Sequence, residues 1–425
     1  MKRFRLGIML ALALCACIFV AGCISDSTTD SEDVITIWAY DSSAEIAQEA
    51  VTSYQKMYPE SDYSFEVVKM GQEDMVEKIK VYLATGSTEI LPNIFYDEDY
   101  NFEEYITYYG DYFVDVTEHI DSSDYYNFKM VNVENNGRIY AIPYDAGTGV
   151  LFYRIDLIQK AGYTEEDMRH LSWDEYISIG RDVKKVTGID MVTLVPEGDM
   201  EGRLLYQSAG TWFFDKDGNA NIKDNPGFVS AMEVMKQASD SGIVYKSSSW
   251  DDIVSCIANG KIASLIGASW WAPIISSYDN QAGLWRVTEM PKMENGGHYS
   301  NLGGGNWFII NKENREIATE FAVEMFSKNQ EIANYAANEY YVIPTNIQQS
   351  KNLKTENNNF FGNQDIIEFM SGTLSGIPAV KYGLHTYEVT YVVGEYVGDY
   401  IYGELTLNQA IDKMHTAVDK VVKSQ

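Results

Sequence analysis

The chain has 425 residues, with 32 basic and 62 acidic side chains, a formal net charge of −30, and 45% apolar and 13% aromatic residues. This apolar share supports a large core, so global disorder is excluded, and the length suits one large or two ordinary domains. Because phosphate backbones require clustered lysine and arginine, the charge argues against a nucleic-acid binder, and it also argues against adsorption to anionic lipid.

The first 22 residues are typical of an export signal. Three basic residues precede an apolar run over 6–20, which is short for a bilayer core of about 30 Å. The segment Val20-Ala21-Gly22-Cys23 resembles the lipobox of bacterial lipoproteins, and this resemblance implies cleavage before Cys23 and a lipid on its thiol. Residues 23–33 are small and polar after the cysteine, so we expect a lipidated Cys23 followed by a flexible tether.

Alternating strand and helix patterns follow the tether. The predicted order is a strand over 34–38, a helix over 42–57, a strand over 63–68, a helix through Leu83 that ends at Gly86, and a strand over 90–96. Ser42 and Glu45 are spaced as a capping box for the first of these helices. This β-α-β-α-β succession predicts a parallel sheet covered by helices.

Three further helices are predicted later in the chain. A capping pattern at Ser172 and Glu175 opens one, and a second carries Ile317, Phe321 and Met325 on one face. A third, final helix is predicted to begin after a cap made by Thr406 and Gln409.

Common catalytic motifs are missing from the sequence. It contains no G-x-S-x-G, P-loop, H-E-x-x-H or C-x-x-C pattern, and its five histidines are scattered without the spacing of metal ligands. Cys256 is the one cysteine that follows Cys23, and its apolar neighbours predict a buried thiol. The acids are too numerous for a glycosidase pair to be chosen by counting. We therefore expect no catalytic residue, no metal and no cofactor.

Nine short patterns follow one another over the length of the chain. They lie at 35–40, 54–59, 83–86 with 91–94, 136–144, 151–154, 172–175, 259–263, 303–305 ahead of a helix, and 343–345. Each pattern is weak alone, but their order and spacing over about 34–420 resemble the family 1 extracellular solute-binding proteins, the lipoproteins that deliver sugars to ABC importers. Asn93 departs from the family pattern, which commonly has Asp there.

This resemblance implies an α/β fold of the periplasmic-binding-protein type (type II), with two α/β lobes joined by hinge crossings and a ligand cleft between them. By analogy, the chain crosses between lobes near 142–147, 263–268 and 310–315. The first lobe is then expected to comprise 34–142 with 268–310, and the second 143–267 with 311–425.

Chemistry and position along the chain indicate the candidate ligand-binding residues. Aromatic rings match the apolar faces of sugars, and carboxylates and amides match their hydroxyl groups, especially where strands end. The candidates are Trp38, Tyr40, Asp41, Asp97, Asp145, Trp212, Trp270, Trp271, Gly304, Asn306, Tyr341 and Tyr382. Core packing is the competing interpretation for the aromatic ones, and a plain tight turn is the competing interpretation for Gly304.

Three tryptophans carry specific expectations. Trp270 and Trp271 follow a predicted strand, and in extended chain they point to opposite sides, so one of them is expected in the cleft. Trp250 was interpreted instead as a packing or loop residue.

Together, these observations predict a substrate-binding lipoprotein of an ABC importer. We expect a monomer held by the lipid on Cys23 at the outer face of the bacterial cytoplasmic membrane. Its expected ligand is an oligosaccharide or a neutral glycoside, and its expected partners are the permease subunits. Arg154 and Arg203 are the local charges that would favour an anionic sugar instead. The alternatives are an extracellular glycoside-acting enzyme and a binding protein for a non-sugar solute such as a peptide or a polyamine.

Overall fold

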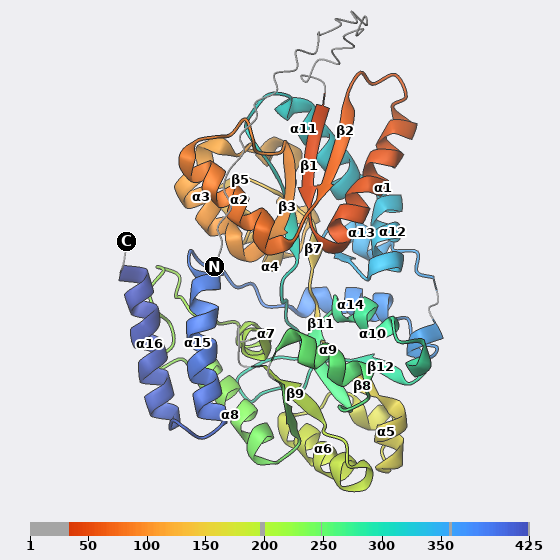
Figure 1. Cartoon of the computed structure of the whole chain (residues 1–425), viewed down its shortest axis with the longest axis vertical. Coiled ribbons are helices and arrows are strands. Elements are labelled where there is room, and N and C mark those ends of the chain that lie inside the picture. The colour runs from red at the N-terminus through yellow and green to blue at the C-terminus, as the bar shows by residue number, and fades with distance from the viewer. Residues whose placement is uncertain (1–33, 196–199, 248, 357–358, 424–425) are drawn as a thin grey trace, which may run out of the picture.

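The computed structural model describes residues 34–195, 200–247, 249–356 and 359–423, which form two α/β lobes stacked along the long axis of the molecule (Figure 1). The predicted export signal, the lipobox with Cys23 and the tether lie outside the described residues. Among the helices that are described, none is long and apolar enough to cross a bilayer.

The first lobe is built on a mixed sheet. Its strands, in sheet order, are β2 (Ser64–Lys69), β1 (Val34–Ala39), β3 (Ile94–Glu98), β13 (Gly305–Ile309) and β6 (Ile142–Pro143). The parallel pairing of β1 with both β2 and β3 confirms the sheet predicted from the alternating pattern. Strand β13 runs antiparallel to β3 and β6. The pattern at 303–305 therefore leads first into a strand, and the helix follows that strand.

Helices and a short hairpin complete the first lobe (Figure 1). These elements are α1 (Asp41–Met57), α2 (Gln72–Thr85), α3 (Phe102–Tyr109), α4 (Asn127–Met130), β4 (Glu134–Asn135), β5 (Arg138–Ile139), α11 (Arg315–Ala322), a π-helical stretch Val323–Lys328, α12 (Gln330–Tyr340) and α13 (Ile347–Lys351). The predicted capping box of α1 is wrong, because Tyr40 is its N-cap and the Ser43 hydroxyl donates to the Tyr40 carbonyl at 2.5 Å. Glu45 pairs instead with Lys69 at 2.7 Å.

The second lobe contains an antiparallel sheet extended by a parallel pair. The strands are β11 (Ser264–Ala268), β8 (Gly149–Arg154) and β12 (Trp285–Thr288), in that order, followed by the pair β10 (Val244–Lys246) and β9 (Val192–Leu194). The Ser264 amide donates to the Met191 carbonyl at 2.7 Å, so the parallel pair lies beside β11.

Helices surround this second sheet. They are α5 (Ile155–Lys160), α6 (Trp173–Thr187), α7 (Met200–Ser208), α8 (Pro226–Asp240), α9 (Trp250–Ala258), α10 (Trp271–Ser276), α14 (Ile366–Thr373), α15 (Thr386–Ile401) and α16 (Leu407–Lys423). The predicted caps of α6 and α16 are confirmed, since Glu175 accepts from the Ser172 amide at 2.8 Å and Gln409 accepts from the Thr406 amide at 3.0 Å. Cys256 is a buried free thiol on α9, as predicted.

Within the described residues, the chain passes between the two sheets at three places. The first change lies between β6 and β8, at 143–149, and the second lies at 300–305, where the Leu302 amide donates to the Gly147 carbonyl at 2.7 Å. At the third, β14 (Ile343–Pro344) pairs with β7 (Asp145–Ala146) between the two sheets.

These positions differ from the expected lobe boundaries. Strand β12 pairs with β8, so residues 285–288 belong to the second sheet rather than to the first lobe. Residues Ala318, Phe321 and Ala322 of α11 pack in the core of the first lobe instead of the second. The second and third crossings therefore fall at about 300–305 and 342–346, later than expected, because spacing alone does not reveal with which strand a segment pairs.

Candidate functional site

A cavity of about 1000 Å³ lies between the lobes, and we call it the cleft. The first lobe contributes residues around the start of α1 and the end of β3, and the crossings contribute 144–147 and 302–304. The second lobe contributes side chains from α7, α9, α10 and α15. Strand ends and crossings of both lobes therefore converge on one cavity, which is where an α/β sheet presents ligand-binding groups.

One wall of the cleft is formed by tryptophan rings. Trp250 and Trp270 line the cavity, and Trp271 is buried behind them. The Trp250 ring stacks on Trp271 with centroids 4.3 Å apart, and its centroid lies 5.6 Å from that of Trp270. The indole of Trp270 is fixed by donating to the Leu302 carbonyl at 3.0 Å. We call these three residues the tryptophan wall.

A glycine makes room for this wall. A Cβ atom at Gly267 would lie 2.4 Å from Cδ1 of Trp271, so only glycine allows the ring to pack there. Trp270 is the N-cap of α10 and Trp271 its first residue. The two ring centroids lie 5.2 Å apart, and Trp270 lines the cleft whereas Trp271 does not. The predicted extended chain with side chains on opposite sides is wrong, because a helix begins at this point.

Trp250 was missed by the sequence interpretation. It is the first residue of α9, after the N-cap Ser249, and its side chain is 42% exposed. Its place in the cleft depends on packing against Trp271, a contact between residues distant in sequence. The capping serine was the only local signal, and it indicates a helix start rather than a binding role.

The cleft carries more acidic than basic side chains. The acids that line it are Asp41, Glu45, Glu73, Glu98 and Asp145, and the bases are Lys69 and Arg203. Lys69 is paired with Glu45, and the Arg203 guanidinium lies 5.3 Å from the centre of the Tyr100 ring. Among the described residues, Arg203 Nε has no hydrogen-bond partner. Arg203 thus adds a positive charge to a lining that is mostly acidic.

Burial changes the acidity of the cleft carboxyl groups. Burial, reinforced by the charge of Asp97, raises the pKa of Glu98 to about 7, although Arg203 opposes the shift. Burial also raises the pKa of Asp145, against the opposing charge of Lys129. The Tyr144 hydroxyl is buried in the same wall and has no partner within the described part of the chain.

Six of the predicted ligand-binding residues line the cleft, and six do not. The six that line it are Tyr40, Asp41, Asp145, Trp270, Gly304 and Tyr341. The six that do not are Trp38, Asp97, Trp212, Trp271, Asn306 and Tyr382. Gly304 has a φ of 80°, and a Cβ there would lie 2.7 Å from the Asp145 carbonyl oxygen, so it permits the close approach of two crossings.

The remaining candidates pack behind the cleft. Asp97 is fully buried and accepts from Tyr105 Oη at 2.7 Å, which joins β3 to α3. Trp212 and Tyr382 pack against Tyr100, a cleft residue, with centroid distances of 5.8 and 4.6 Å. Both rings therefore support the cleft wall without lining it.

Trp38 and Asn306 also lie outside the cleft. Trp38 is half-buried against the core of the first lobe. Asn306 Nδ2 donates to Asp99 Oδ1 at 2.7 Å, so this side chain belongs to the polar network of the crossings.

A buried lysine joins the segments that change sheets. Lys129 has no exposed surface, and its Nζ lies 2.6 Å from Asp99 Oδ1, 2.9 Å from the Asp145 carbonyl oxygen and 2.7 Å from the Gly305 carbonyl oxygen. Asp145 in turn accepts from the Gly305 amide at 2.7 Å. The end of β3, the first crossing and the start of β13 are thus held by one cation directly behind the cleft.

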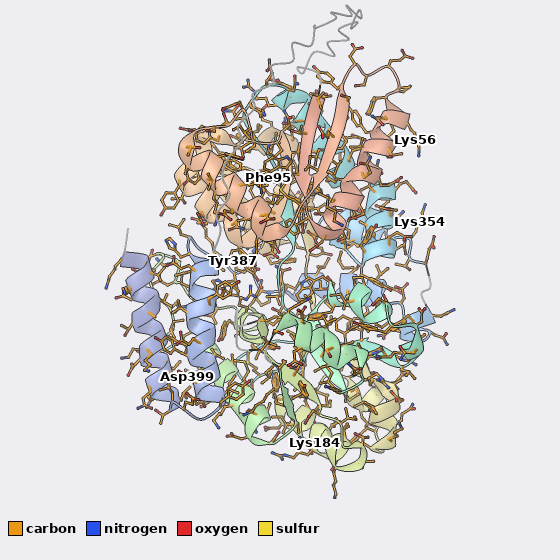
Figure 2. The ribbon with its side chains drawn as sticks, viewed as in Figure 1. Lys56, Phe95, Lys184, Lys354, Tyr387 and Asp399 are labelled. Atoms are coloured by element: carbon orange, nitrogen blue, oxygen red, sulfur yellow. The ribbon has the colours of Figure 1, made fainter. Side chains whose placement is uncertain are left out.

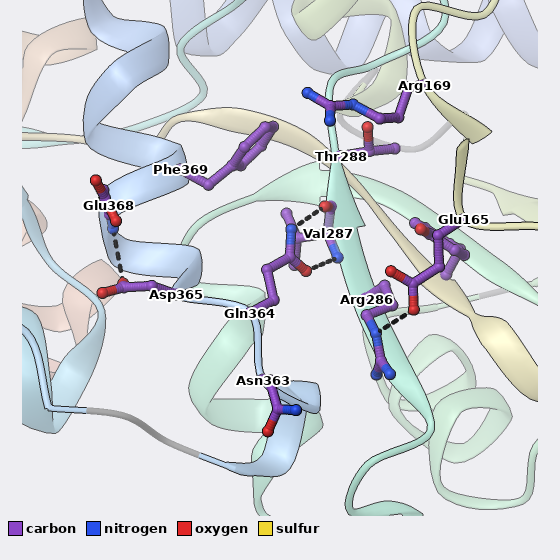
Figure 3. Close-up of a pocket in the computed structure, with 11 residues that line it drawn as sticks. Glu165, Arg169, Arg286, Val287, Thr288, Asn363, Gln364, Asp365, Glu368 and Phe369 are labelled. Carbon is purple, nitrogen blue, oxygen red and sulfur yellow. Dashed lines mark hydrogen bonds and ion pairs between the residues drawn. The ribbon is translucent and has the colours of Figure 1, made fainter. Parts of the chain in front are cut away.

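A second pocket, of about 520 Å³, lies on the second lobe at the edge strand β12 (Figure 3). Gln364 crosses its floor, accepting from the Val287 amide at 2.8 Å and donating to the Val287 carbonyl at 2.5 Å. Glu165 accepts from Arg286 at 2.8 Å on the other side. The Gln364 amide thus takes the place of a neighbouring strand and protects an open sheet edge.

The chemistry of the cleft suits recognition of a hydroxylated ring. Aromatic faces, carboxylate acceptors and one unpaired guanidinium nitrogen converge there, which is the combination that matches C–H faces and hydroxyl groups. In the described part of the chain, no group of three or more His, Cys, Asp or Glu side chains is placed to hold a metal ion.

Comparison with known proteins identifies a family and several relatives of this chain. Residues 49–361 match the family of bacterial extracellular solute-binding proteins. The lactose-binding protein of Rhizobium radiobacter is 30% identical over 369 residues, 85% of this chain and 87% of that protein. The arabinooligosaccharide-binding protein of Bacillus subtilis is 24% identical over 363 residues, 82% of each chain.

A solved structure shows the same fold. The sugar-binding protein MalE from Xanthomonas citri superposes with a TM-score of 0.77 at 17% sequence identity, over 92% of this chain and 97% of that one. The predicted two-lobe fold of the type II periplasmic-binding-protein class is thereby confirmed.

Proposed function

Because this chain belongs to the bacterial extracellular solute-binding proteins, we propose that it is the substrate-binding component of an ABC importer and that its ligand is a carbohydrate. The observation that carries the proposal is the cleft, where rings of the tryptophan wall and the carboxylates of Glu98 and Asp145 line one cavity. The names of the lactose-binding and arabinooligosaccharide-binding relatives support the same class of ligand.

In this proposal the protein performs no covalent chemistry. A sugar that contacts Trp270 from one lobe and Asp41 from the other binds the closed arrangement better than the open one. It therefore shifts the population toward closure by the difference in affinity. The permease subunits are proposed to recognise the closed form. The lipid on Cys23 is proposed to hold the monomer at the outer face of the cytoplasmic membrane.

The charges of the cleft support a neutral ligand. Acidic lining side chains outnumber basic ones, and Lys69 is already paired, which leaves Arg203 as the cation available to a ligand. A sugar carboxylate placed near Glu98 and Asp145 meets like charges in a partly buried site, which disfavours binding. Arg154 is paired with Asp156 at 2.8 Å and does not line the cleft.

A thermal-shift screen tests the class of ligand. We expect lactose, arabino-oligosaccharides or maltodextrins to raise the melting temperature, because a ligand that binds only the folded state stabilises it by RT ln(1 + [L]/Kd). We expect oligogalacturonides, peptides and polyamines to leave it unchanged. Stabilisation by peptides or polyamines alone would overturn the carbohydrate assignment, and release of reducing sugar from an added oligosaccharide would indicate a glycoside-acting enzyme.

Replacing Trp250 with alanine is expected to weaken binding of the sugar found in that screen by about tenfold, or ~1.4 kcal/mol, which is typical of losing one aromatic contact. Titration calorimetry measures the change. Tyr108→Ala is the matched control, because Tyr108 is similarly exposed (48%) and does not line the cleft. Equal affinities of the two variants would show that Trp250 does not contact the ligand.

A further inference from the structure

One hydrogen bond crosses the cleft from the second lobe to the first. Tyr387 Oη donates to Glu98 Oε2, and both side chains line the cleft. Glu98 is the last residue of β3, whereas Tyr387 lies in the first turn of α15, which packs against α8 and α16. Figure 2 shows Tyr387 at the end of α15 that faces the first lobe. The bond therefore joins elements whose main packing lies in different lobes.

The segment that leads into α15 is also attached to the first-lobe side. Lys381 Nζ lies 3.0 Å from Glu103 Oε2 on α3. Asn132 donates to the Val380 carbonyl at 2.9 Å and accepts from the Tyr382 amide at 3.2 Å. Residues 380–382, shortly before α15, are thus attached to the first lobe. This attachment holds the Tyr387 hydroxyl against Glu98.

Several charged and titratable groups surround Glu98. Asp97 and Asp99 flank it on the chain, Arg203 faces it from α7, and Gln72 from α2 is a further hydrogen-bond donor. Tyr40, the N-cap of α1, is near enough for its pKa to be raised by the charge of Glu98. Tyr387 is the donor from the second lobe's C-terminal helices, so losing it frees an acceptor directed at the cleft.

From this geometry we infer that the Tyr387 phenol occupies, in the empty protein, the hydrogen-bonding position at Glu98 that a hydroxyl group of the ligand takes on binding. The inference rests on the proposed function. A phenol and a sugar hydroxyl are the same kind of donor to a carboxylate, so the ligand exchanges one hydrogen bond for another. Tyr387 then competes with the ligand for the Glu98 carboxylate. In the ligand-free protein its hydrogen bond also restrains the two lobes relative to each other.

Tyr387→Phe tests this inference, because it removes the hydroxyl and keeps the ring. Tyr396→Phe is the matched control, since Tyr396 also lies on α15 and does not line the cleft. By titration calorimetry with the sugar found in the thermal-shift screen, we expect Tyr387→Phe to bind about fivefold to tenfold more tightly than the wild type, the effect of removing one competing charge-assisted hydrogen bond. Tyr396→Phe is expected to bind like the wild type.

A second measurement needs no ligand. Small-angle scattering of the ligand-free proteins is expected to give a larger radius of gyration for Tyr387→Phe than for the wild type and Tyr396→Phe. Weaker sugar binding by Tyr387→Phe would overturn the inference, because the hydroxyl then contacts the ligand itself. Equal radii together with equal affinities would overturn it as well. If no carbohydrate binds any of the three proteins, the proposed function fails, and the scattering comparison alone decides whether Tyr387 restrains the lobes.

Discussion

Replacing Lys129 with methionine is expected to lower the free energy of unfolding by about 3–5 kcal/mol, the usual cost of removing one partner of a buried ion pair. The side chains of Lys129 and Asp99 are 0% and 1% exposed, so water cannot replace the lost ammonium group. The carbonyl oxygens of Asp145 and Gly305 lose the same donor. A loss of this size is a large part of the typical 5–15 kcal/mol stability of a folded protein.

An ion pair at the surface serves as the control, because it shows how much stability is lost when an exposed pair of the same length is broken. Lys423 and Asp419 on α16 are also 2.6 Å apart, but their side chains are 72% and 39% exposed. Lys423→Met is therefore expected to cost no more than about 1 kcal/mol. Urea denaturation of both variants measures the difference, and similar midpoints would show that the buried network does not stabilise the crossings.

A double variant tests whether the uncompensated charge is the cause. Asp99→Asn combined with Lys129→Met removes both charges, and the new amide can still interact with Asn306, the present partner of Asp99. We expect the double variant to recover part of the lost stability, because replacing both members of a buried pair costs less than removing one. The recovery is expected in sugar affinity as well, since the network holds the walls of the cleft.

The alternating pattern of the first hundred residues was sufficient to predict the parallel strands, because parallel pairing with helical connections leaves a local trace in the spacing of apolar residues. The antiparallel additions left no such trace. Strand β12 pairs with β8 and β13 pairs with β3, across separations of more than a hundred residues. These strands are only four and five residues long and mix apolar with polar side chains, so their sequence does not indicate a partner. The lobe boundaries were misplaced for this reason.

The candidate site shows the same division between local and long-range information. Position along the chain was enough to predict that Tyr40, Asp41 and Asp145 line the cleft, because these residues follow strand ends or lie at crossings. Trp212 and Tyr382 satisfy the same chemical criteria but are buried behind Tyr100. Residue type cannot distinguish an aromatic ring that lines a cavity from one that supports its wall. The difference depends on which helices of the second lobe pack together.

The stability of the folded protein is expected to increase as the pH falls from 8 to about 5.5. Burial raises the pKa of Glu98 and Glu201 to about 7, and that of Asp97 and Asp99 to about 6. In the unfolded chain such groups titrate near about 4. The folded state therefore binds protons more tightly at these sites. Their stabilising contribution is complete below about pH 4 and is lost as the pH rises through 6 and 7.

Other carboxyl groups set the lower limit of this range. Hydrogen bonds from Ser172 lower the pKa of Glu175. Burial acts to raise the pKa of Glu289, but hydrogen bonds and the charge of His170 outweigh it, so this pKa is lowered as well. Groups of this kind stabilise the fold above their unfolded pKa and lose that contribution as the pH falls toward acid values. The two sets together predict a maximum of stability between about pH 4.5 and 6, which differential scanning calorimetry across a buffer series can locate.

The protein's net charge of −30 also favours mildly acidic pH through reduced self-repulsion, so the buried groups need a separate test. Glu201→Gln removes one buried carboxylate, and its amide oxygen can still accept from the Val195 amide, which now donates to Glu201 at 3.1 Å. Glu60→Gln removes the same charge from an exposed position. We expect the melting-temperature difference between pH 5.5 and 8 to shrink in Glu201→Gln and to persist in Glu60→Gln. If both variants behave alike, net charge rather than burial determines the pH dependence.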